Sequence, residues 1–518
     1  MRSSAHGWMG VVVALALGIS ACDRASGTPA SGPAAWRSDC ASAEPPAPLG
    51  MEAARDAHRA AERRHDLRFR EAADPGYFLR TVGAALDPER LAAGTLCLDD
   101  VATLGQMIFD HEYAFRDGLA GGTAARAPTG PFRRIHDGAI GGPETISCSS
   151  CHWIGGANGA GAETDNVFLL GDGARIDTAD ERNPPALVAL GVVQALAREM
   201  SRDLQRQRDA LARASADAGE ARTARLATKG VEFGELRADA RGGIDASGLR
   251  GVDADLVVKP FGWKGTQAEF ADFATDALQV HIGIQNDVLL ASGSPELYGD
   301  GADPADRDGD GVRSELGPGP FAALLVHLAV LELPVVEPLV QSTRMEPAAS
   351  QVLPPRAANF AEDFQRGRAK FHALGCAECH RPMLVLERPV IELPGVPPID
   401  LARTMRRPML THDPAVGGYP VWLFSDLKRH DMGAQNAARH VQRGVKLAEY
   451  LTPRLWGVAD SGPYLHDGRA PSFDYAIAGH DGEGAAARAA FAALSREEKG
   501  DVNVYLMALR RPPRLLVP

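Results

Sequence analysis

The sequence contains SCSSCH at residues 147–152 and GCAECH at residues 375–380, two copies of one Cys-x-x-Cys-His pattern. Two thiols three positions apart can form thioethers with both vinyl groups of a haem, and the adjoining histidine can then ligate the iron. A zinc knuckle would need a second Cys or His pair nearby, and no further cysteine lies near either motif. A redox-active dithiol is the other alternative. Two copies that both end in histidine favour two c-type haems.

The residues of these haem sites follow from the pattern. The predicted covalent attachment sites are Cys148, Cys151, Cys376 and Cys379. The predicted proximal iron ligands are His152 and His380. Because the two motifs lie far apart in the chain, we expect each haem to have its own domain.

The N-terminus has the pattern of an export signal. Residues 8–19 are almost wholly apolar, which is short for a membrane span but typical of a signal-peptide core. Small residues directly precede Cys22, as in a bacterial lipobox, so we predict a lipoprotein signal peptide over residues 1–21 and lipidation of Cys22. An ordinary signal peptide cleaved nearby is the alternative. We therefore expect a periplasmic protein held to a bacterial membrane by a lipid anchor only.

Composition limits the domain organisation and the partners. The chain has 518 residues and is 45% hydrophobic, which is enough for several cores. Its net charge of -12 argues against nucleic acid as a partner, because phosphate-binding surfaces need clustered lysine and arginine. The predicted units are a flexible tether (22–49), a helical region of unknown role (50–127), the first haem domain (128–346) and the second (356–518).

The secondary-structure pattern predicts a mainly α fold, with two cytochrome c-like haem domains and the N-terminal helical region. Residues 186–229 have few helix-breaking residues and should contain a long helix. Ser495 and Glu498 form a capping box that predicts the start of the last helix. Strand signals are sparse. Two of the seven cysteines remain unassigned, and an oxidising compartment permits a disulfide between Cys40 and Cys97, although two unrelated thiols are the alternative.

From about residue 130 to its end, the chain resembles the bacterial di-haem cytochrome c peroxidase superfamily, most closely its branch of di-haem, thiol-oxidoreductase-like oxidoreductases. The segments that carry the resemblance are residues 182–187 (RNPPAL), 261–265 (FGWKG), 367–380, 430–433 (HDMG), 451–457 (LTPRLWG), 462–469 (GPYLHDGR) and 476–480 (AIAGH). The resemblance implies one haem per domain. One haem would store an electron with ligands on both faces, and the other would cleave peroxide.

The resemblance also implies a distal ligand for the second haem. Relatives carry it fourteen residues after the histidine of a Tyr-x-His-x-Gly motif, and the same offset from His466 leads to His480. Many relatives have methionine there, and histidine would lower the haem potential relative to methionine. The alternative is that Met432 ligates the iron and His480 lies in a surface loop.

The first haem departs from the family pattern. The well-known peroxidases have a histidine in the loop after the motif, but this chain has none between His152 and His281. Trp263 matches a tryptophan that relatives place between the haems, and His281 lies near the position of their catalytic carboxylate. His281 is therefore a candidate distal acid–base residue, an iron ligand, or a packed histidine. His111 and His136 are weaker candidates, and Trp263 could be a plain core aromatic.

Calcium is a further candidate cofactor beside the two haems. Asn183 and Thr452 match positions that help to hold a calcium ion between the domains in relatives. Separately, Asp306, Asp308 and Asp310 alternate as in an EF-hand loop, although the twelfth position is glycine. An acidic, solvated turn is the alternative.

These observations predict a peroxidase-like di-haem oxidoreductase. A periplasmic donor, such as a small cytochrome c or a cupredoxin, would reduce the second haem. Electrons would pass by Trp263 to the first haem, where hydrogen peroxide is reduced near His281. The first alternative is a non-enzymatic di-haem electron carrier with both irons six-coordinate. A calcium-dependent docking protein is another, but it leaves the haems without a role.

Overall fold

A computed structural model describes residues 35–36, 77–118, 144–292, 312–331, 360–403 and 409–511. Several sequence predictions fall on residues outside these ranges, namely the signal peptide, the tether apart from residues 35–36, Cys22, Cys40, His136 and the acidic loop with Asp306, Asp308 and Asp310. Trp36, within the predicted tether, is buried in the first core. Cys97 is disulfide-bonded. None of the described helices is long and apolar enough to cross a membrane.

The fold is mixed α and β, so the prediction of a mainly α fold is wrong. The described residues form five small antiparallel sheets, four of them with only two strands. The two-stranded sheets pair β1 (Val167–Leu169) with β2 (Asp180–Arg182), β6 (Leu384–Leu386) with β9 (Tyr419–Val421), β7 (Val390–Ile391) with β8 (Ile399–Asp400), and β10 (Arg429–Asp431) with β11 (Glu449–Leu451). Strands of two or three residues are too short to show an alternating pattern, so no sequence signal predicts them.

The first hydrophobic core is built on α8 (Pro318–Val330), which is buried on nearly all sides. The N-terminal helices α2 (Tyr77–Ala85), α3 (Pro88–Ala92) and α4 (Leu98–Phe109) pack against it. The closest contact is between α4 and α8, where Gly105 faces the backbone of Ala323. Helices α6 (Phe270–Ala277) and α7 (Asp287–Ser292) lie on the same core. The described part of the N-terminal helical region is therefore continuous with the core of the first haem unit.

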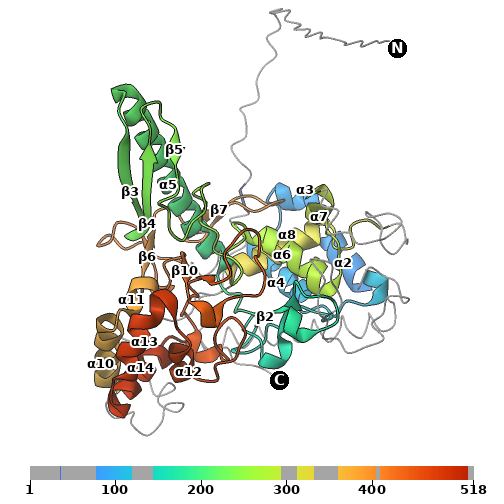
Figure 1. Ribbon diagram of the computed structural model, residues 1–518. Coiled ribbons are helices and arrows are strands. Elements are labelled where there is room, and N and C mark those ends of the chain that lie inside the picture. Colours follow the sequence, from blue (N-terminus) through green and yellow to red (C-terminus); the bar gives the residue numbers. More distant parts are fainter. Residues whose placement is uncertain are drawn as a thin grey trace, which may run out of the picture.

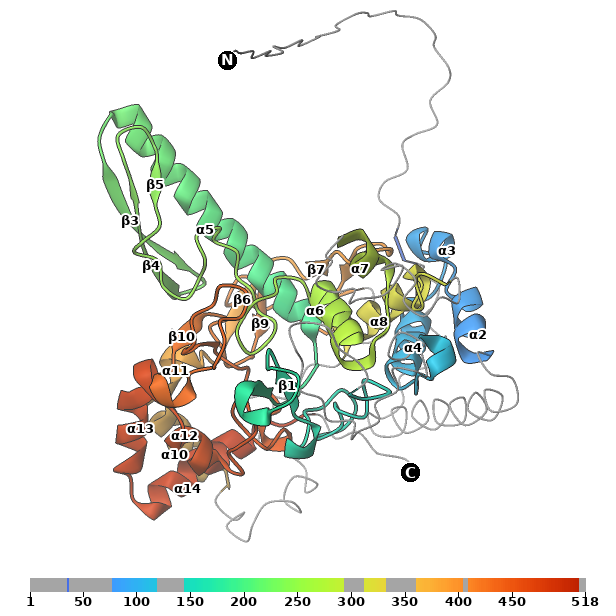
Figure 2. The same cartoon turned by 45° about the vertical axis from the view of Figure 1, so that its right-hand side comes forward.

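A long arm projects from the body of the molecule (Figures 1 and 2). It consists of α5 (Leu190–Ala218), the long helix expected from the sequence, and the sheet of β3 (Arg222–Thr228), β4 (Val231–Ala238) and β5 (Ile244–Asp245). The first half of α5 is buried in the first core, while the sheet covers one side of the second half. At the β3–β4 turn, Lys229 Nζ donates to the Val385 carbonyl at 2.7 Å and pairs with Glu199 at 2.7 Å. These contacts fix the turn to the body.

The second core holds the C-terminal helices together. It lies between α10 (Phe360–Ala373) and α14 (Arg496–Met507), with α12 (Phe473–Ala478) and α13 (Ala485–Ala492) alongside. Tyr505 is fully buried at its centre, among Phe364, Phe371 and Phe424. The short helix α11 (Cys376–Cys379) follows α10. The predicted capping box at Ser495 and Glu498 is confirmed, and α14 begins there.

The two cores share part of the chain. Apolar side chains between residues 384 and 427, such as Leu386, Ile399 and Leu423, pack into the first core although they follow the second Cys-x-x-Cys-His motif. Phe424 packs into the second core instead. The two haem motifs therefore lie in units that are joined by a common apolar layer.

Replacing Gly367 by alanine should destabilise the second core by about 1–3 kcal/mol. A Cβ at Gly367 in α10 would lie 2.0 Å from the Asp501 carbonyl oxygen of α14, which forces the two helices apart. Gly83→Ala in α2 is the matched control, because nothing lies within 4 Å of its added Cβ, and it should stabilise the protein by about 0.5–1 kcal/mol. Urea unfolding of both variants tests this, and an equal effect at the two sites would contradict the close packing.

Candidate haem sites

At the second motif, two histidine rings face one another. His380 directly follows α11, and its Nδ1 lies 3.2 Å from the Phe424 carbonyl oxygen. His480 follows α12, and its Nδ1 lies 2.8 Å from the Ala476 carbonyl oxygen. Because a carbonyl only accepts, each Nδ1 carries the proton and each Nε2 has a free lone pair. The ring centres are 6.3 Å apart.

This separation fits two ligands of one haem iron. An imidazole nitrogen bonds a metal at about 2 Å, so two rings on opposite sides of one ion have centres about 6 Å apart. Burial lowers the pKa of His380 to about 4 and also lowers the pKa of His480, which keeps both rings neutral. Neutral imidazole is the form that binds metals.

The space around these rings also suits a large apolar cofactor. A cavity of about 520 Å³ is lined by both histidines, by Cys376 and Cys379, and by apolar side chains that include Phe371, Ile477 and Leu506. Met432, the alternative ligand, lines the same cavity. The Asn436 amide donates to the carbonyls of Met432 (2.7 Å) and Gly479 (3.0 Å) and so ties the loop before His480 to the strand β10 region. His480 lies across from the His380 ring.

At the first motif, His152 is oriented in the same way. Its Nδ1 lies 3.0 Å from the Pro185 carbonyl and 3.3 Å from the Gly159 carbonyl. Burial lowers its pKa to about 4. The Phe109 ring at the end of α4 lies 6.3 Å from the His152 ring, so the N-terminal helices contribute directly to this site. No role of this region could be predicted from the sequence.

His281 is paired with a carboxylate that the sequence reasoning missed. It lies on a π-helical turn, Leu278–Ile282, that ends at Gly283 with a left-handed φ of 89°. Its Nδ1 contacts a carboxylate oxygen of Glu144, and its own carbonyl accepts the backbone N–H groups of Glu144 (2.7 Å) and Thr145 (3.3 Å). The Glu144 side chain is 7% exposed and the His281 side chain 29%. Burial is the main cause of the low pKa of His152, and the nearby His281 lowers that pKa further. The Glu144–His281 pair therefore lies close to the first motif.

The only sequence signal for this pair is the position of Glu144, four residues before Cys148. The weaker candidate His111 is placed differently. It stacks on Phe78 with ring centres 4.2 Å apart and lies 3.5 Å from Asp117, within the packing of the N-terminal helices.

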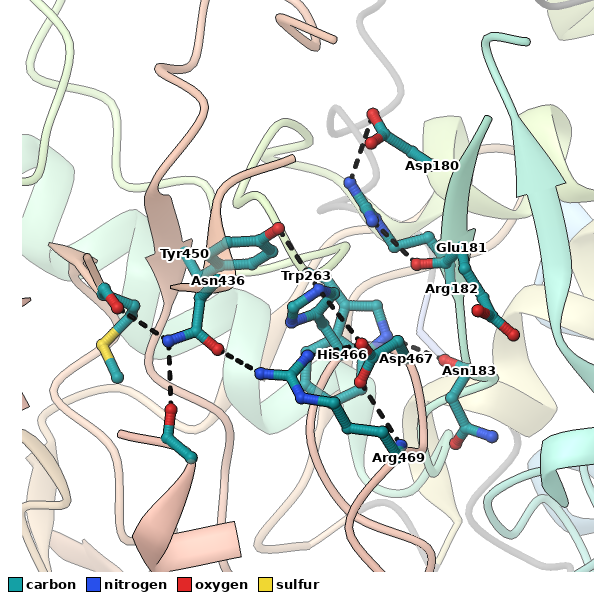
Figure 3. A network of polar contacts seen from close by, with 12 residues as sticks. Asp180, Glu181, Arg182, Asn183, Trp263, Asn436, Tyr450, His466, Asp467 and Arg469 are labelled. Atoms are coloured by element: carbon teal, nitrogen blue, oxygen red, sulfur yellow. Dashed lines mark hydrogen bonds and ion pairs between the residues drawn. The ribbon is translucent and has the colours of Figure 1, made fainter. Parts of the chain in front are cut away.

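Trp263 lies where the two units meet. Its indole Nε1 donates to the Asn183 carbonyl at 2.7 Å, and its carbonyl accepts the Leu451 N–H at 2.9 Å. Beside it, the Tyr450 and His466 rings stack with centres 4.4 Å apart. Figure 3 shows Trp263, Asn183, Tyr450 and His466 in one network of polar contacts. Trp263 also lines the cavity of the second site.

The two residues expected to help hold calcium also line this cavity. Asn183 Nδ2 lies within 3.1 Å of three oxygens, the carbonyls of Gly161 and Ala162 and the side chain of Asn166. The Thr452 carbonyl accepts the Ser425 hydroxyl at 2.7 Å. Asn183 thus presents its amide nitrogen to a cluster of oxygens, and calcium binding there stays a prediction.

A third histidine, His430, lies between two carboxylates beside the second motif. Its Nε2 is 2.8 Å from Asp426 and its Nδ1 is 2.8 Å from Glu483. Cys379, Asp426 and His430 are the only set among the described residues with atoms close enough to hold a metal ion. The thioether predicted at Cys379 would compete with such a use.

The junction also contains a buried lysine that should make stability depend on pH. Lys264 is 1% exposed, and its Nζ donates to the carbonyls of Lys446 (2.7 Å) and Leu447 (2.9 Å). Burial, aided by the charge of Arg182, lowers its pKa to about 8 from 10.5. Between about pH 8 and pH 10.5, Lys264 is more fully protonated in the unfolded chain than in the folded protein. The free energy of unfolding therefore rises with pH in this range.

We therefore expect the wild type to gain about 1–3 kcal/mol over Lys264→Met between about pH 8 and pH 10.5. Urea unfolding of both proteins at several pH values measures this difference. Parallel pH profiles would show that Lys264 is not desolvated at the junction.

Paired thiols beside buried, neutral histidines at two separate sites define a protein built to carry two haems. Residues 348–509 match the family described as "Di-haem oxidoreductase, putative peroxidase". This confirms the resemblance for the part of the chain with the second motif and His480. No curated protein matches the chain.

Proposed function

We propose that this protein is a periplasmic c-type peroxidase that reduces hydrogen peroxide at the first haem with electrons received through the second. The observation that carries the proposal is the Glu144–His281 pair beside His152. A c-type haem supplies an iron that binds peroxide where one face is open and stores an electron where protein ligands occupy both faces.

At the second site, His380 and His480 would take both faces of the iron. Each ring is fixed by a backbone carbonyl and kept neutral by burial, so neither would need to lose a proton before it binds the metal. A site closed in this way favours electron transfer over reaction with peroxide. Cys376 and Cys379 would attach the cofactor.

At the first site, Cys148 and Cys151 would attach the haem and His152 would be its proximal ligand. His281 would be the distal acid–base residue. With its Nδ1 proton directed to Glu144, its Nε2 can take a proton from peroxide and return it to the leaving oxygen. The buried Glu144 carboxylate would stabilise the imidazolium formed between these two transfers. In this way the carboxylate would act through His281.

Further observations support the other components of the proposal. Trp263 lies at the junction of the two units and would relay electrons between them. The disulfide at Cys97 is typical of an oxidising compartment, which supports export and a lipid anchor at Cys22. A small cytochrome c or cupredoxin would be the electron donor. A calcium ion near Asn183 and Thr452 would stabilise the junction.

One observation also favours a di-haem electron carrier. A histidine that donates Nδ1–H to a carboxylate is the usual arrangement of a metal ligand. His281 could therefore close the first iron with Glu144 as its hydrogen-bond acceptor. The two functions differ in whether the first iron has an open face.

Optical and EPR spectra of the purified holo-protein test this choice, in the ferric and half-reduced states and with and without hydrogen peroxide. We expect one low-spin haem and one high-spin haem. Peroxide should change the high-spin signal, and in the half-reduced state it should also re-oxidise the second haem. Two low-spin haems that are inert to peroxide in both states would overturn the peroxidase and leave the electron carrier.

A further inference from the structure

Arg454 presents a guanidinium to the cavity with few of its hydrogen bonds made. Its five N–H donors have one partner among the described residues, a long bond of 3.5 Å from Nη2 to the Ala186 carbonyl. Its Nε is buried without a hydrogen-bond partner. The residue lines the cavity of about 520 Å³ that holds the His380 and His480 rings.

The charge of Arg454 has no carboxylate partner among the described residues. Its Cζ lies 5.9 Å from the centre of the Trp456 ring, which is a weak contact for a cation. A second arginine on the same wall, Arg488, pairs with Asp481 at 3.3 Å. A guanidinium that has only an aromatic ring and one long hydrogen bond as partners favours an anion beside it.

Arg454 lies between the supports of the two proximal histidines. Its one bond goes to Ala186, the neighbour of Pro185, whose carbonyl holds the His152 ring. On the other side, the N–H of Leu455 donates to the Leu423 carbonyl at 3.2 Å, and the next carbonyl, that of Phe424, holds His380. An anion at Arg454 would thus lie near the edges of both cofactors.

We propose that Arg454 is the binding site for a propionate carboxylate of one of the bound haems. The inference requires bound haem, as the proposed function does, but not reaction with peroxide. The wall is mostly apolar, so an ionised carboxylate inside it needs a cation, and the planar guanidinium can bind both carboxylate oxygens at once. The pair would neutralise both charges and fix the position of that haem in the cavity.

This role affects the haem potential. Without Arg454 the carboxylate is an unpaired negative charge beside the iron, which favours the ferric state and lowers the reduction potential. The pKa of the propionate carboxylate rises when the cation is lost, so this carboxylate takes up a proton as the pH falls. The reduction potential of the haem then becomes more dependent on pH.

Arg454→Met removes the charge at similar volume. Arg206→Met is the control, because it removes an exposed arginine of α5 that does not line the cavity. Redox titrations followed by the separate optical and EPR signals of the two haems should be made from about pH 4 to pH 8, where carboxylates with raised pKa values titrate. We expect Arg454→Met to lower one potential near neutral pH and to steepen its pH dependence, while Arg206→Met leaves both unchanged. The haem whose signal shifts is the source of the propionate.

Unchanged potentials and pH profiles in Arg454→Met with full haem content would overturn the proposal. If this variant does not mature, Arg454→Lys keeps the charge but loses the planar fork. The haem propionate bands in the resonance Raman spectrum of Arg454→Lys should then shift from those of the wild type. Identical bands would equally overturn the proposal. A shift of potential in a protein inert to peroxide would sustain this inference while the proposed function fails.

Discussion

Replacing His281 by alanine is expected to lower kcat/KM for hydrogen peroxide by about 10²–10⁴-fold, the usual contribution of a positioned acid–base group. The loss follows because the Glu144–His281 pair beside the first motif would be removed. Steady-state assays with a small-molecule electron donor measure it. His412→Ala, which removes an exposed histidine, should leave kcat/KM unchanged, and covalent haem content must match the wild type in both variants.

Glu144→Gln tests how the pair works. The amide keeps the size of the side chain but cannot stabilise the imidazolium, so we expect a loss of about 10–100-fold with haem spectra unchanged. Activity in this variant should fall mainly in kcat, because peroxide binding itself does not use the carboxylate. If His281→Ala instead turns a low-spin first haem high-spin and increases the reaction with peroxide, His281 is an iron ligand and the acid–base role is wrong.

Replacing His480 by methionine should raise the potential of the second haem by a sizeable part of the roughly 0.8 V range that axial ligands span. The 6.3 Å separation of the His380 and His480 rings places the substituted side chain across from the proximal ligand. Redox titration measures the shift, and the optical spectrum should change from that of a bis-histidine haem to that of a histidine–methionine haem.

Met432→Leu is the matched control, because Met432 lines the same cavity and was the alternative ligand. It should leave the potential and the spectrum unchanged. The opposite result, in which Met432→Leu alters the second haem and His480→Met does not, would transfer the ligand role to Met432. The higher potential in His480→Met should also slow peroxide turnover, because the second haem then passes on its electron less readily.

The residues that carry cofactor chemistry could be read from the sequence where that chemistry depends on local spacing. Two cysteines and a histidine within five positions act together in any fold, so the haem sites needed no tertiary information. The capping box at Ser495 and Glu498 and the long helix α5 are likewise local, because each depends on residues within a few turns. His480 was predicted as a ligand from the fourteen-residue offset in related proteins, without a structure.

Long-range pairing was beyond the sequence. The mainly α prediction failed because most strands are only two or three residues long, too short to show an alternating pattern, while β3 follows directly after a helix that its composition seemed to continue. Glu144 and His281 are 137 positions apart and meet only because the π-helical turn docks on the segment before the first motif.

The sequence by itself determined that this protein has two sites built to bind haem, since covalent attachment is encoded in short motifs. Only the tertiary structure decided which groups surround those sites. It placed the N-terminal Phe109 against His152, the Glu144 carboxylate on His281, and the guanidinium of Arg454 between the supports of the two proximal ligands. The physical reason is that hydrogen bonding, burial and charge compensation depend on distance in space, and a lone arginine or glutamate in a sequence carries no mark of what folding will bring beside it.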